Sequence, residues 1–333
     1  MRTRPAMHRR FPLPCAAVVM ALAGVGAGPA HASDSGGLQA GDGEAAKPAP
    51  EGRDGAKLDA PREKASPPKA KGKRRSPRSR DAGRPVLSAF SARPSRLFLY
   101  GTPATVAFRI SDKSRTVKVR LDVLGTGGRV LRRIDLGSRP TGSVQSYRLT
   151  GREGGHLPQG ALELRIAARD PSGRSLKRTA KASGVDRLGF YWHHFPVAGN
   201  FGFGGDGSRF GSARPGHVHQ GQDIPTPEGT PLLAPRGGRV RIVANQPGGA
   251  GQYVILTGAG ERREYAFFHL QAGSIRVRPG QTVRTGERMG STGNTGSSSG
   301  AHLHFEVWEG GPWQGGGRPV DPLPYLRNWD GWS

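Results

Sequence analysis

The segment His302-Leu303-His304-Phe305-Glu306-Val307-Trp308 alternates polar and apolar side chains along most of its length. This alternation has the period of a β-strand that buries one face in a core. We therefore expect Leu303, Phe305 and Val307 to pack inward. His302 and His304 then project together from the opposite face, as Glu306 and Trp308 do. Two imidazoles side by side on a strand are unusual without a chemical role, so the segment predicts a metal or catalytic site.

A second segment, His219-Gln220-Gly221-Gln222-Asp223, carries a histidine and a carboxylate four residues apart. That spacing places both on one side of either a helix or a strand. Gly221 lies between them, and Pro225 and Pro227 follow, so an extended segment is favoured over a helix. His269 ends a further strand-like run over residues 263–268.

His219–Asp223, His269 and His302-Leu303-His304 together supply four histidines and one carboxylate, and half of the ten histidines lie between residues 217 and 304. Each piece alone is weak, because H-x-x-x-D occurs often by chance and a lone histidine usually packs or faces solvent. Zinc prefers imidazole and carboxylate ligands, and a catalytic site keeps one position open for water. The combination therefore predicts one zinc ion with an open position. His217 is expected to be a surface or rim residue.

The same segments resemble the M23 family of zinc peptidases, of the lysostaphin and LytM type. Residues 219–231 are similar to the first metal motif of that family, and residues 293–306 to the second. Residues 268–270 and 277–286 match its connecting segments, and residues 319–322 match its end. The resemblance extends over residues 187–327.

Carried over by position, this resemblance implies that His219, Asp223 and His304 bind one zinc ion per chain. It implies that His302 and His269 form the catalytic pair. A zinc-activated water would attack an amide bond directly, with no acyl-enzyme. His302 would serve as general base and then acid, and His269 would stabilise the oxyanion. The sequence departs from the family in having Phe267 where a tyrosine is usual, with Tyr265 two residues earlier.

The Gly/Ser-rich run over residues 291–300 lacks the G-x-x-x-x-G-K-[ST] pattern of a phosphate-binding loop. Small residues let a peptide backbone approach closely. We expect a mobile loop at the rim of a substrate groove; the alternative is a spacer.

The first 32 residues have the pattern of a secretory signal. A basic stretch precedes an apolar run over residues 14–28, and Ala30-His31-Ala32 suits a cleavage site. The apolar run is shorter than the roughly 20 residues of a membrane-spanning helix, so no stable membrane span is expected. Cys15, the single cysteine, lacks the context of a lipid-attachment site. The chain is expected to be secreted, extracytoplasmic and associated with the cell wall.

The formal net charge is +25, and residues 33–86 are rich in Ala, Pro, Gly, Lys and Arg. Such a segment buries too little apolar surface to fold, so we expect a disordered basic linker. In a cytosolic chain this charge would suggest nucleic acid. Export favours anionic cell-wall polymers instead, and no nucleic-acid partner is expected. The alternative is that the charge only maintains solubility.

Residues 87–182 switch to a period of two, as in the run from Val117 to Val123, with turns at residues 126–128 and 170–173. Short strands with regular turns predict an immunoglobulin-like β-sandwich. The following residues, 187–333, predict a mainly antiparallel β-sheet peptidase domain, with strands over 239–244, 252–257 and 263–269 and a hairpin between 279 and 286. The fold class is therefore all-β, without a long amphipathic helix.

Together these features predict a secreted zinc endopeptidase. The family resemblance implies its substrate class, which is the peptide cross-links of peptidoglycan. Two alternatives of another class remain. One is a catalytically latent wall-binding or regulatory protein of the same family. The other is a polyanion-binding protein that acts through the basic linker.

Overall fold

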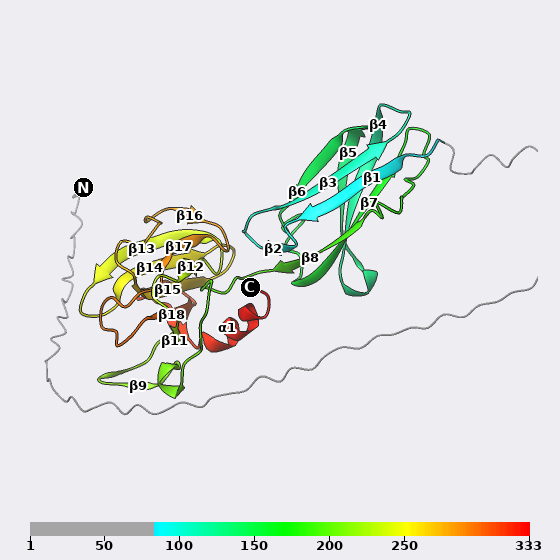
Figure 1. The fold of residues 1–333 in the computed structure, drawn as a ribbon. Coiled ribbons are helices and arrows are strands. Elements are labelled where there is room, and N and C mark those ends of the chain that lie inside the picture. Colours follow the sequence, from blue (N-terminus) through cyan, green and yellow to red (C-terminus); the bar gives the residue numbers. More distant parts are fainter. Residues whose placement is uncertain (1–82) are drawn as a thin grey trace, which may run out of the picture. The chain divides into compact units, whose positions relative to one another are not determined.

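The computed structural model describes residues 83–333. The expected signal segment, 1–32, and residues 33–82 of the expected linker lie outside the described residues. Strands account for most of the regular structure that is described, which confirms the expectation of a β protein (Figure 1). No helix in this part of the chain is long and apolar enough to cross a membrane.

Residues 86–191 form a three-stranded sheet of order β1-β3-β6 and a five-stranded sheet of order β2-β8-β7-β4-β5. Neighbouring strands are antiparallel except for β2 and β8, which are parallel. The elements are β1 (Val86–Arg93), β2 (Arg96–Phe98), β3 (Ala104–Ser111), β4 (Thr116–Leu124), the 3₁₀ turn η1 (Thr126–Gly128), β5 (Val130–Pro140), β6 (Val144–Leu149), β7 (Gly160–Arg169) and β8 (Val185–Tyr191).

The two sheets share one apolar core. On β4, Val117, Val119, Leu121 and Val123 are all buried, as the period-two pattern predicts. They join one cluster with buried residues of both sheets. The immunoglobulin-like topology and the division at residues 87–182 and 187–333 stay predictions; β8, which pairs with β7, lies beyond residue 182.

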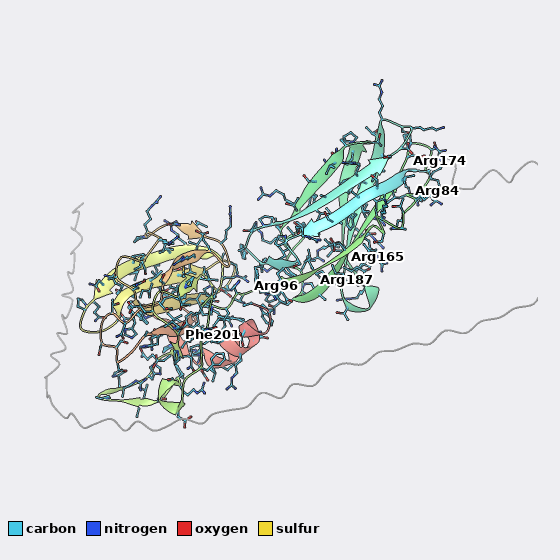
Figure 2. All side chains as sticks on the ribbon, viewed as in Figure 1. Arg84, Arg96, Arg165, Arg174, Arg187 and Phe201 are labelled. Atoms are coloured by element: carbon cyan, nitrogen blue, oxygen red, sulfur yellow. The ribbon has the colours of Figure 1, made fainter. Side chains whose placement is uncertain are left out.

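Charged residues occupy the outer side of the five-stranded sheet. Arg165 on β7 and Arg187 on β8 flank Glu163, with N–O distances of 2.6 and 3.2 Å (Figure 2). Because both guanidinium groups are exposed, each pair contributes at most about 1 kcal/mol. This surface therefore owes its order to the core beneath it.

A seven-stranded sheet organises residues 222–320. Its order is β11-β18-β15-β14-β13-β16, β19 pairs with β18, and every pair is antiparallel. Two small sheets, β9–β10 and β12–β17, lie outside it. The elements are η2 (Asp206–Ser208), β9 (Ala213–Arg214), β10 (His217–Val218), β11 (Gln222–Pro225), β12 (Pro231–Leu233), β13 (Gly238–Gln246), β14 (Gly251–Gly258), β15 (Arg263–Leu270), β16 (Thr282–Val283), β17 (Arg288–Ser291), β18 (His302–Glu309), β19 (Arg318–Val320) and α1 (Leu323–Asp330).

The expected strands over 239–244, 252–257 and 263–269 are confirmed as β13, β14 and β15. The expected hairpin between 279 and 286 is wrong, because β16 pairs with β13 instead. The main chain of Val240 accepts a hydrogen bond from Gly280 and donates one to Gln281. The segment therefore satisfies its backbone groups on the existing sheet edge.

The seven-stranded sheet has two different faces. On one, Leu303, Phe305 and Val307 of β18 are fully buried in a core that also contains Trp329 of α1. On the other, Phe268 belongs to a smaller apolar cluster. The central strand β15 is covered on both faces, and seven of its eight residues are buried. Polar groups that project from this second face therefore lie in a largely dry environment.

The short helix α1 closes the first of these faces. Prolines are tolerated in a first helical turn, where N–H groups have no intrahelical partner, and Pro324 lies there. Trp329 of α1 stacks on the ring of His193 with a centroid distance of 4.9 Å. His193 Nε2 lies 3.0 Å from Oε2 of Glu261, whose other oxygen accepts a hydrogen bond from the Tyr265 hydroxyl at 2.6 Å.

The His193–Glu261 pair predicts acid sensitivity. Burial lowers the pKa of His193 below its ordinary value of 6.5. Burial alone would raise the pKa of Glu261, but hydrogen bonds from His193 and Tyr265 hold it below 4.5. Both groups bind protons more readily in the unfolded chain, so stability falls as pH decreases, first below about 6.5 for His193.

We expect His193→Gln, which keeps a donor for Glu261 but does not titrate, to flatten the dependence of the unfolding midpoint on pH between 7 and 5. Thermal unfolding of the metal-free protein followed by circular dichroism measures this. His217→Gln, at an exposed position, is the control and keeps the wild-type slope. Equal pH dependences of the unfolding midpoint in all three proteins would contradict the assignment of the acid sensitivity to His193.

Candidate metal centre

Three neighbouring strands bring the candidate residues together. On the antiparallel pair β11–β18, Asp223 lies opposite His304. The next strand, β15, places Phe268 opposite His304 on its other side, and His269 follows. His219 precedes β11, and hydrogen bonds between its main chain and residues 211 and 212 fix its backbone.

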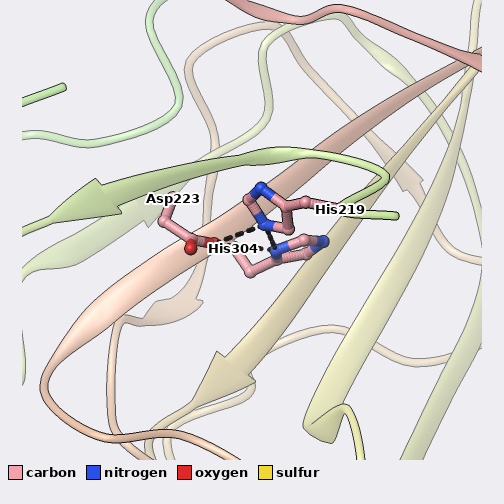
Figure 3. A group of neighbouring side chains, drawn as sticks. All are labelled: His219, Asp223 and His304. Carbon is pink, nitrogen blue, oxygen red and sulfur yellow. Dashed lines mark hydrogen bonds and ion pairs between the residues drawn. The ribbon is translucent and has the colours of Figure 1, made fainter. Parts of the chain in front are cut away.

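Figure 3 shows His219, Asp223 and His304 converging. His219 Nε2 lies 3.0 Å from Asp223 Oδ1 and 2.9 Å from His304 Nδ1, and His304 Nδ1 lies 2.8 Å from Asp223 Oδ1. The three side chains are only 5, 18 and 13% exposed. Two imidazole nitrogens and a carboxylate oxygen thus point at one small, mostly dry space.

These three atoms fit the donor set of a divalent metal ion. They are the only group of three or more His, Cys, Asp or Glu within residues 83–333 whose ligand atoms gather in this way. Metal–ligand bonds of about 2.0–2.1 Å in a tetrahedron require ligand atoms roughly 3.3 Å apart. The observed atoms need to separate by only a few tenths of an ångström.

The far nitrogen of each imidazole in the trio has its own acceptor. His219 Nδ1 donates to the carbonyl oxygen of Arg209 at 2.7 Å, and His304 Nε2 lies 3.1 Å from Oε1 of Glu306. Arg214 Nη2 donates to the second oxygen of Asp223 at 3.2 Å. Such partners orient the ligands of metal sites and set the tautomer of each ring.

Electrostatics inside the trio are strongly coupled. Burial alone would raise the pKa of Asp223, but hydrogen bonds from His219 and His304 hold it well below its usual value. Burial alone would lower the pKa of His304, but hydrogen bonds to Asp223 and Glu306 raise it to about 9. In the metal-free protein a proton therefore resides between His304 and Asp223, and a metal ion must displace it.

Gly221 allows the trio to close. A Cβ atom at this position would lie 2.6 Å from the carbonyl oxygen of Phe305 and 2.8 Å from Nε2 of His304. The absence of a side chain lets the segment before β11 cross the His304 ring. The glycine between His219 and Asp223 is thus required by a close approach.

His302 and His269 lie beside the trio. His302 Nε2 is 3.6 Å from Asp223 Oδ1, and the rings of His302 and His269 are 4.8 Å apart. Nδ1 of His302 donates to the carbonyl of Gly300 at 2.8 Å, and Nδ1 of His269 donates to that of Thr295 at 2.8 Å. Each neutral ring then keeps a lone pair on Nε2.

The backbone of His269 is in the left-handed region, with φ of 62°. That conformation is uncommon outside glycine and is concentrated at functional positions. It turns the side chain out of the β15 alternation. Burial is the main cause that lowers the pKa of His269 to about 4, so the ring is neutral at pH 7.

The segment 291–300 reaches this site, since its carbonyl groups hold both His269 and His302. His217 is exposed and outside the trio. Phe267 is fully buried in the core, and so is Tyr265, whose hydroxyl donates to Glu261. The hydroxyl of Tyr265 therefore does not reach the site, and Tyr265 does not replace the tyrosine that the family usually has at the position of Phe267.

Three further residues lie at the site although the sequence did not predict them there: Arg214, Glu306 and Trp313. Glu306 could have been found, because it follows His304 by two residues and shares its face of β18. Arg214 and Trp313 carry no such signal, since each reaches the site from a loop or a two-residue strand.

Comparison with known proteins agrees with this geometry. The sequence model of Peptidase family M23 matches residues 217–322. An uncharacterized metalloprotease of Haemophilus influenzae is 44% identical over 105 residues, which are 32% of this chain and 20% of that protein. Peptidoglycan DD-endopeptidase ShyA of Vibrio cholerae is 38% identical over 89 residues, 27% of this chain and 20% of that protein.

Lipoprotein NlpD of Yersinia enterocolitica is 32% identical over 104 residues, which are 31% of this chain and 97% of that protein. The chain thus spans nearly all of this relative but only a fifth of the length of the other two. In each case the matched part amounts to about a third of this chain or less.

The trio predicts one divalent metal ion per chain. We expect Asp223→Ala and His304→Ala to weaken metal binding more than the 10–100-fold typical of outer partners, because each removes a ligand. Affinity should also be lower at pH 6 than at pH 8, since the metal competes with the proton on His304. Competition with a chromophoric chelator measures both effects. His302→Ala is the control; if it released the metal as well, the assignment of three ligands would be wrong.

We expect Gly221→Ala to disturb the same site through a steric clash. The added methyl group must displace either the His304 ring or the Phe305 carbonyl, so we expect a destabilisation of about 1–3 kcal/mol and weaker metal binding. Denaturant unfolding and the same chelator competition measure these. Gly205→Ala is a matched control, because a Cβ there meets nothing within 4 Å and φ is −87°. Wild-type binding by Gly221→Ala would contradict the close-approach argument.

Proposed function

Because the chain belongs to peptidase family M23, we propose that it is a zinc-dependent endopeptidase that cuts peptide cross-links of bacterial peptidoglycan. We propose that it works outside the cytoplasm, at the cell wall. Its metal ligands in this proposal are His219, Asp223 and His304, and its catalytic pair is His302 and His269.

One observation carries the proposal: three ligand atoms within 4.8 Å of one another, with two further imidazoles beside them. A purely structural metal site uses four protein ligands, whereas a catalytic one uses three and leaves a position for water. The two remaining histidines have lone pairs on Nε2, which suits proton transfer. The arrangement thus favours hydrolysis over metal storage.

The substrate class follows from the relatives. ShyA is named as a peptidoglycan DD-endopeptidase. Since this chain spans a fifth of ShyA, the transfer of that activity is a proposal. We favour a D-alanyl bond in a direct cross-link as the bond that is cut, with a glycine bridge as second choice.

Zinc, when bound, would lower the pKa of a water ligand to about 7 and polarise the scissile carbonyl. His302 is placed to accept the proton of the attacking water at Nε2, because its Nδ1–H is held by Gly300. The imidazolium so formed donates this proton to the leaving amine. Asp223 keeps its negative charge throughout, since Arg214 and the two histidines favour the carboxylate.

His269 receives a different role from the oxyanion donor expected from the sequence. Its Nδ1–H donates to Thr295, so the neutral ring offers only an acceptor at Nε2. Donation to an oxyanion would need a second proton, which a pKa of about 4 opposes. We therefore assign His269 to orienting the attacking water through Nε2.

A second candidate function is a latent or regulatory protein of the cell wall. It is favoured by the likeness to NlpD, which is named as a lipoprotein. The polyanion-binding alternative depends on the net charge of +25 and on the basic linker. The three candidates differ in what they require: an intact catalytic pair, an intact fold alone, or the linker.

The enzyme proposal predicts that purified protein releases uncross-linked fragments from peptidoglycan sacculi. The release should stop with a zinc chelator and return with Zn²⁺. His302→Ala should lower the rate by about 10²–10⁴-fold, the usual contribution of general acid–base catalysis, while its zinc content stays that of wild type. Mass spectrometry of the fragments measures the rate and identifies the bond.

Ser299→Ala is the control variant, since it lies in the same loop and its side chain makes no hydrogen bond that we observe within residues 83–333. Intact cross-links in the presence of zinc-loaded wild type would rule out the enzyme in favour of the regulatory candidate. Binding to sacculi that is lost only on removal of residues 33–82 would favour the polyanion-binding candidate.

A further inference from the structure

Glu306 is a buried carboxylate on the site-facing side of β18. It is 5% exposed, and within residues 83–333 its only ion pair is with His304. Its Oε1 lies 3.1 Å from Nε2 of His304. Its Oε2 accepts hydrogen bonds from the indole nitrogens of Trp308 at 2.7 Å and Trp313 at 3.1 Å. A buried carboxylate with no arginine or lysine partner needs another reason to be there.

The two indoles determine which hydrogen bonds each carboxylate oxygen of Glu306 can make. An indole N–H can only donate, so Oε2 is fixed as an acceptor by two donors. Oε1 is then left to accept from the His304 ring. A ring with a lone pair on Nε2 would set that lone pair against a carboxylate oxygen in a dry site, which is unfavourable. The carboxylate therefore favours the tautomer with a proton on Nε2.

That tautomer is the one that a metal ion requires at this position. With Nε2 protonated, the lone pair of His304 lies on Nδ1, the atom that points to Asp223 and His219. The opposite tautomer would turn an N–H toward the other two ligands. The hydrogen bond to Glu306, on the side of the His304 ring that faces away from the other two ligands, thus decides which ring nitrogen carries the proton.

Trp313 reaches Glu306 from a separate part of the chain. It lies in the connection between β18 and β19, which contains five glycines over residues 310–317. Its ring packs against those of Tyr253, Phe268 and Trp308 at 5.9, 6.1 and 6.5 Å. This side chain covers the sheet face beside Glu306.

The backbone of Trp313 is itself held by charged groups. Its N–H donates to Oε2 of Glu264 at 2.7 Å, and its carbonyl accepts from Arg241 at 3.0 Å. Glu264 also pairs with Arg241 at 2.8 Å. A second buried carboxylate on the same face therefore fixes the loop without touching His304, whereas Glu306 touches the ring directly.

We propose that Glu306, held between the indoles of Trp308 and Trp313, is a positioning residue that fixes the tautomer and orientation of His304 for metal binding. The inference rests on the metal site of the proposed function. It concerns how the site is prepared and is independent of which bond is cut. It also gives the glycine-rich connection after β18 a role: it delivers one of the two donors.

Zinc affinity, measured by chelator competition on the purified full chain, tests the proposal without reference to peptidoglycan. We expect Glu306→Gln to weaken zinc binding by about 10–100-fold, the range typical of partners that orient metal ligands. Trp313→Phe keeps an aromatic ring and the net charge but loses the indole donor, and should weaken binding by about 3–10-fold, a part of that range. Glu309→Gln is the control on the same strand, because this carboxylate pairs with Arg263 and Tyr325 and contacts neither indole; it should bind zinc as wild type does.

These variants separate positioning from charge. If Glu306 acted only through its negative charge, Trp313→Phe would bind zinc as tightly as wild type, and that result would overturn the proposal. An equal loss in Glu306→Gln and Glu309→Gln would overturn it as well. Should Glu306→Gln fail to fold, Trp313→Phe alone still decides whether Glu306 acts by positioning His304 or only by its charge.

A spectroscopic measurement reads the tautomer directly. In the zinc-loaded wild type, long-range ¹H–¹⁵N correlation should report a proton on Nε2 of His304 and none on Nδ1. Trp313→Phe, and Glu306→Gln if it is loaded at high zinc, should show faster solvent exchange of the Nε2 proton. Zinc bound through Nε2 of His304 in wild type, with the proton on Nδ1, would overturn the inference. If wild type binds no zinc, the proposed function fails; if it binds but cuts nothing, this inference stands.

Discussion

The register of β11 against β18 is the constraint on which the site depends. It sets Asp223 opposite His304 and, one residue further, Ile224 opposite Leu303. Both apolar residues are fully buried, and burial of such side chains is worth about 1.5–3 kcal/mol each. Because the side-chain period of a strand is two, a slip by one residue would expose them and would turn Asp223 away from the histidines. The core on one face therefore fixes the chemistry on the other.

The polar groups of the site are arranged so that each ring nitrogen faces a defined partner. His219 and His304 direct one nitrogen to the shared space and the other to Arg209 and Glu306, respectively. The neighbouring pair, His302 and His269, is held in the same manner by carbonyl groups of the loop before β18. Fixed partners on the outer side reserve the inner nitrogens for a metal ion or for proton transfer. The positive φ of His269 fits this arrangement, since the ring must leave the plane of β15 to join the others.

Rigidity and access are divided between strands and loops. Asp223, His302 and His304 come from paired strands, where their backbones are fixed by the ladder. Thr295, Gly300 and Trp313 come from glycine-rich connections that pack against those strands and complete the surroundings of the rings. Sites whose ligands lie on regular elements hold their geometry more accurately than sites on loops, and the loops can then vary around the site. Glycines such as Gly221 permit the close contacts that this division requires.

The sequence by itself determined several of the strands and singled out five candidate site residues. Alternation predicted β18 and the buried set Leu303, Phe305 and Val307, and motif spacing selected His219, Asp223, His269, His302 and His304, because both signals are local. Only the tertiary structure decided that β16 joins β13 and forms no hairpin of its own, since such pairing depends on which sheet edge is open. It also decided which nitrogen of each ring faces the shared space and that Arg214, Glu306 and Trp313 belong beside it. Arg214 meets Asp223 across 9 residues, His219 meets His304 across 85, and Trp313 reaches Glu306 from a loop, so no periodicity of the chain encodes these contacts.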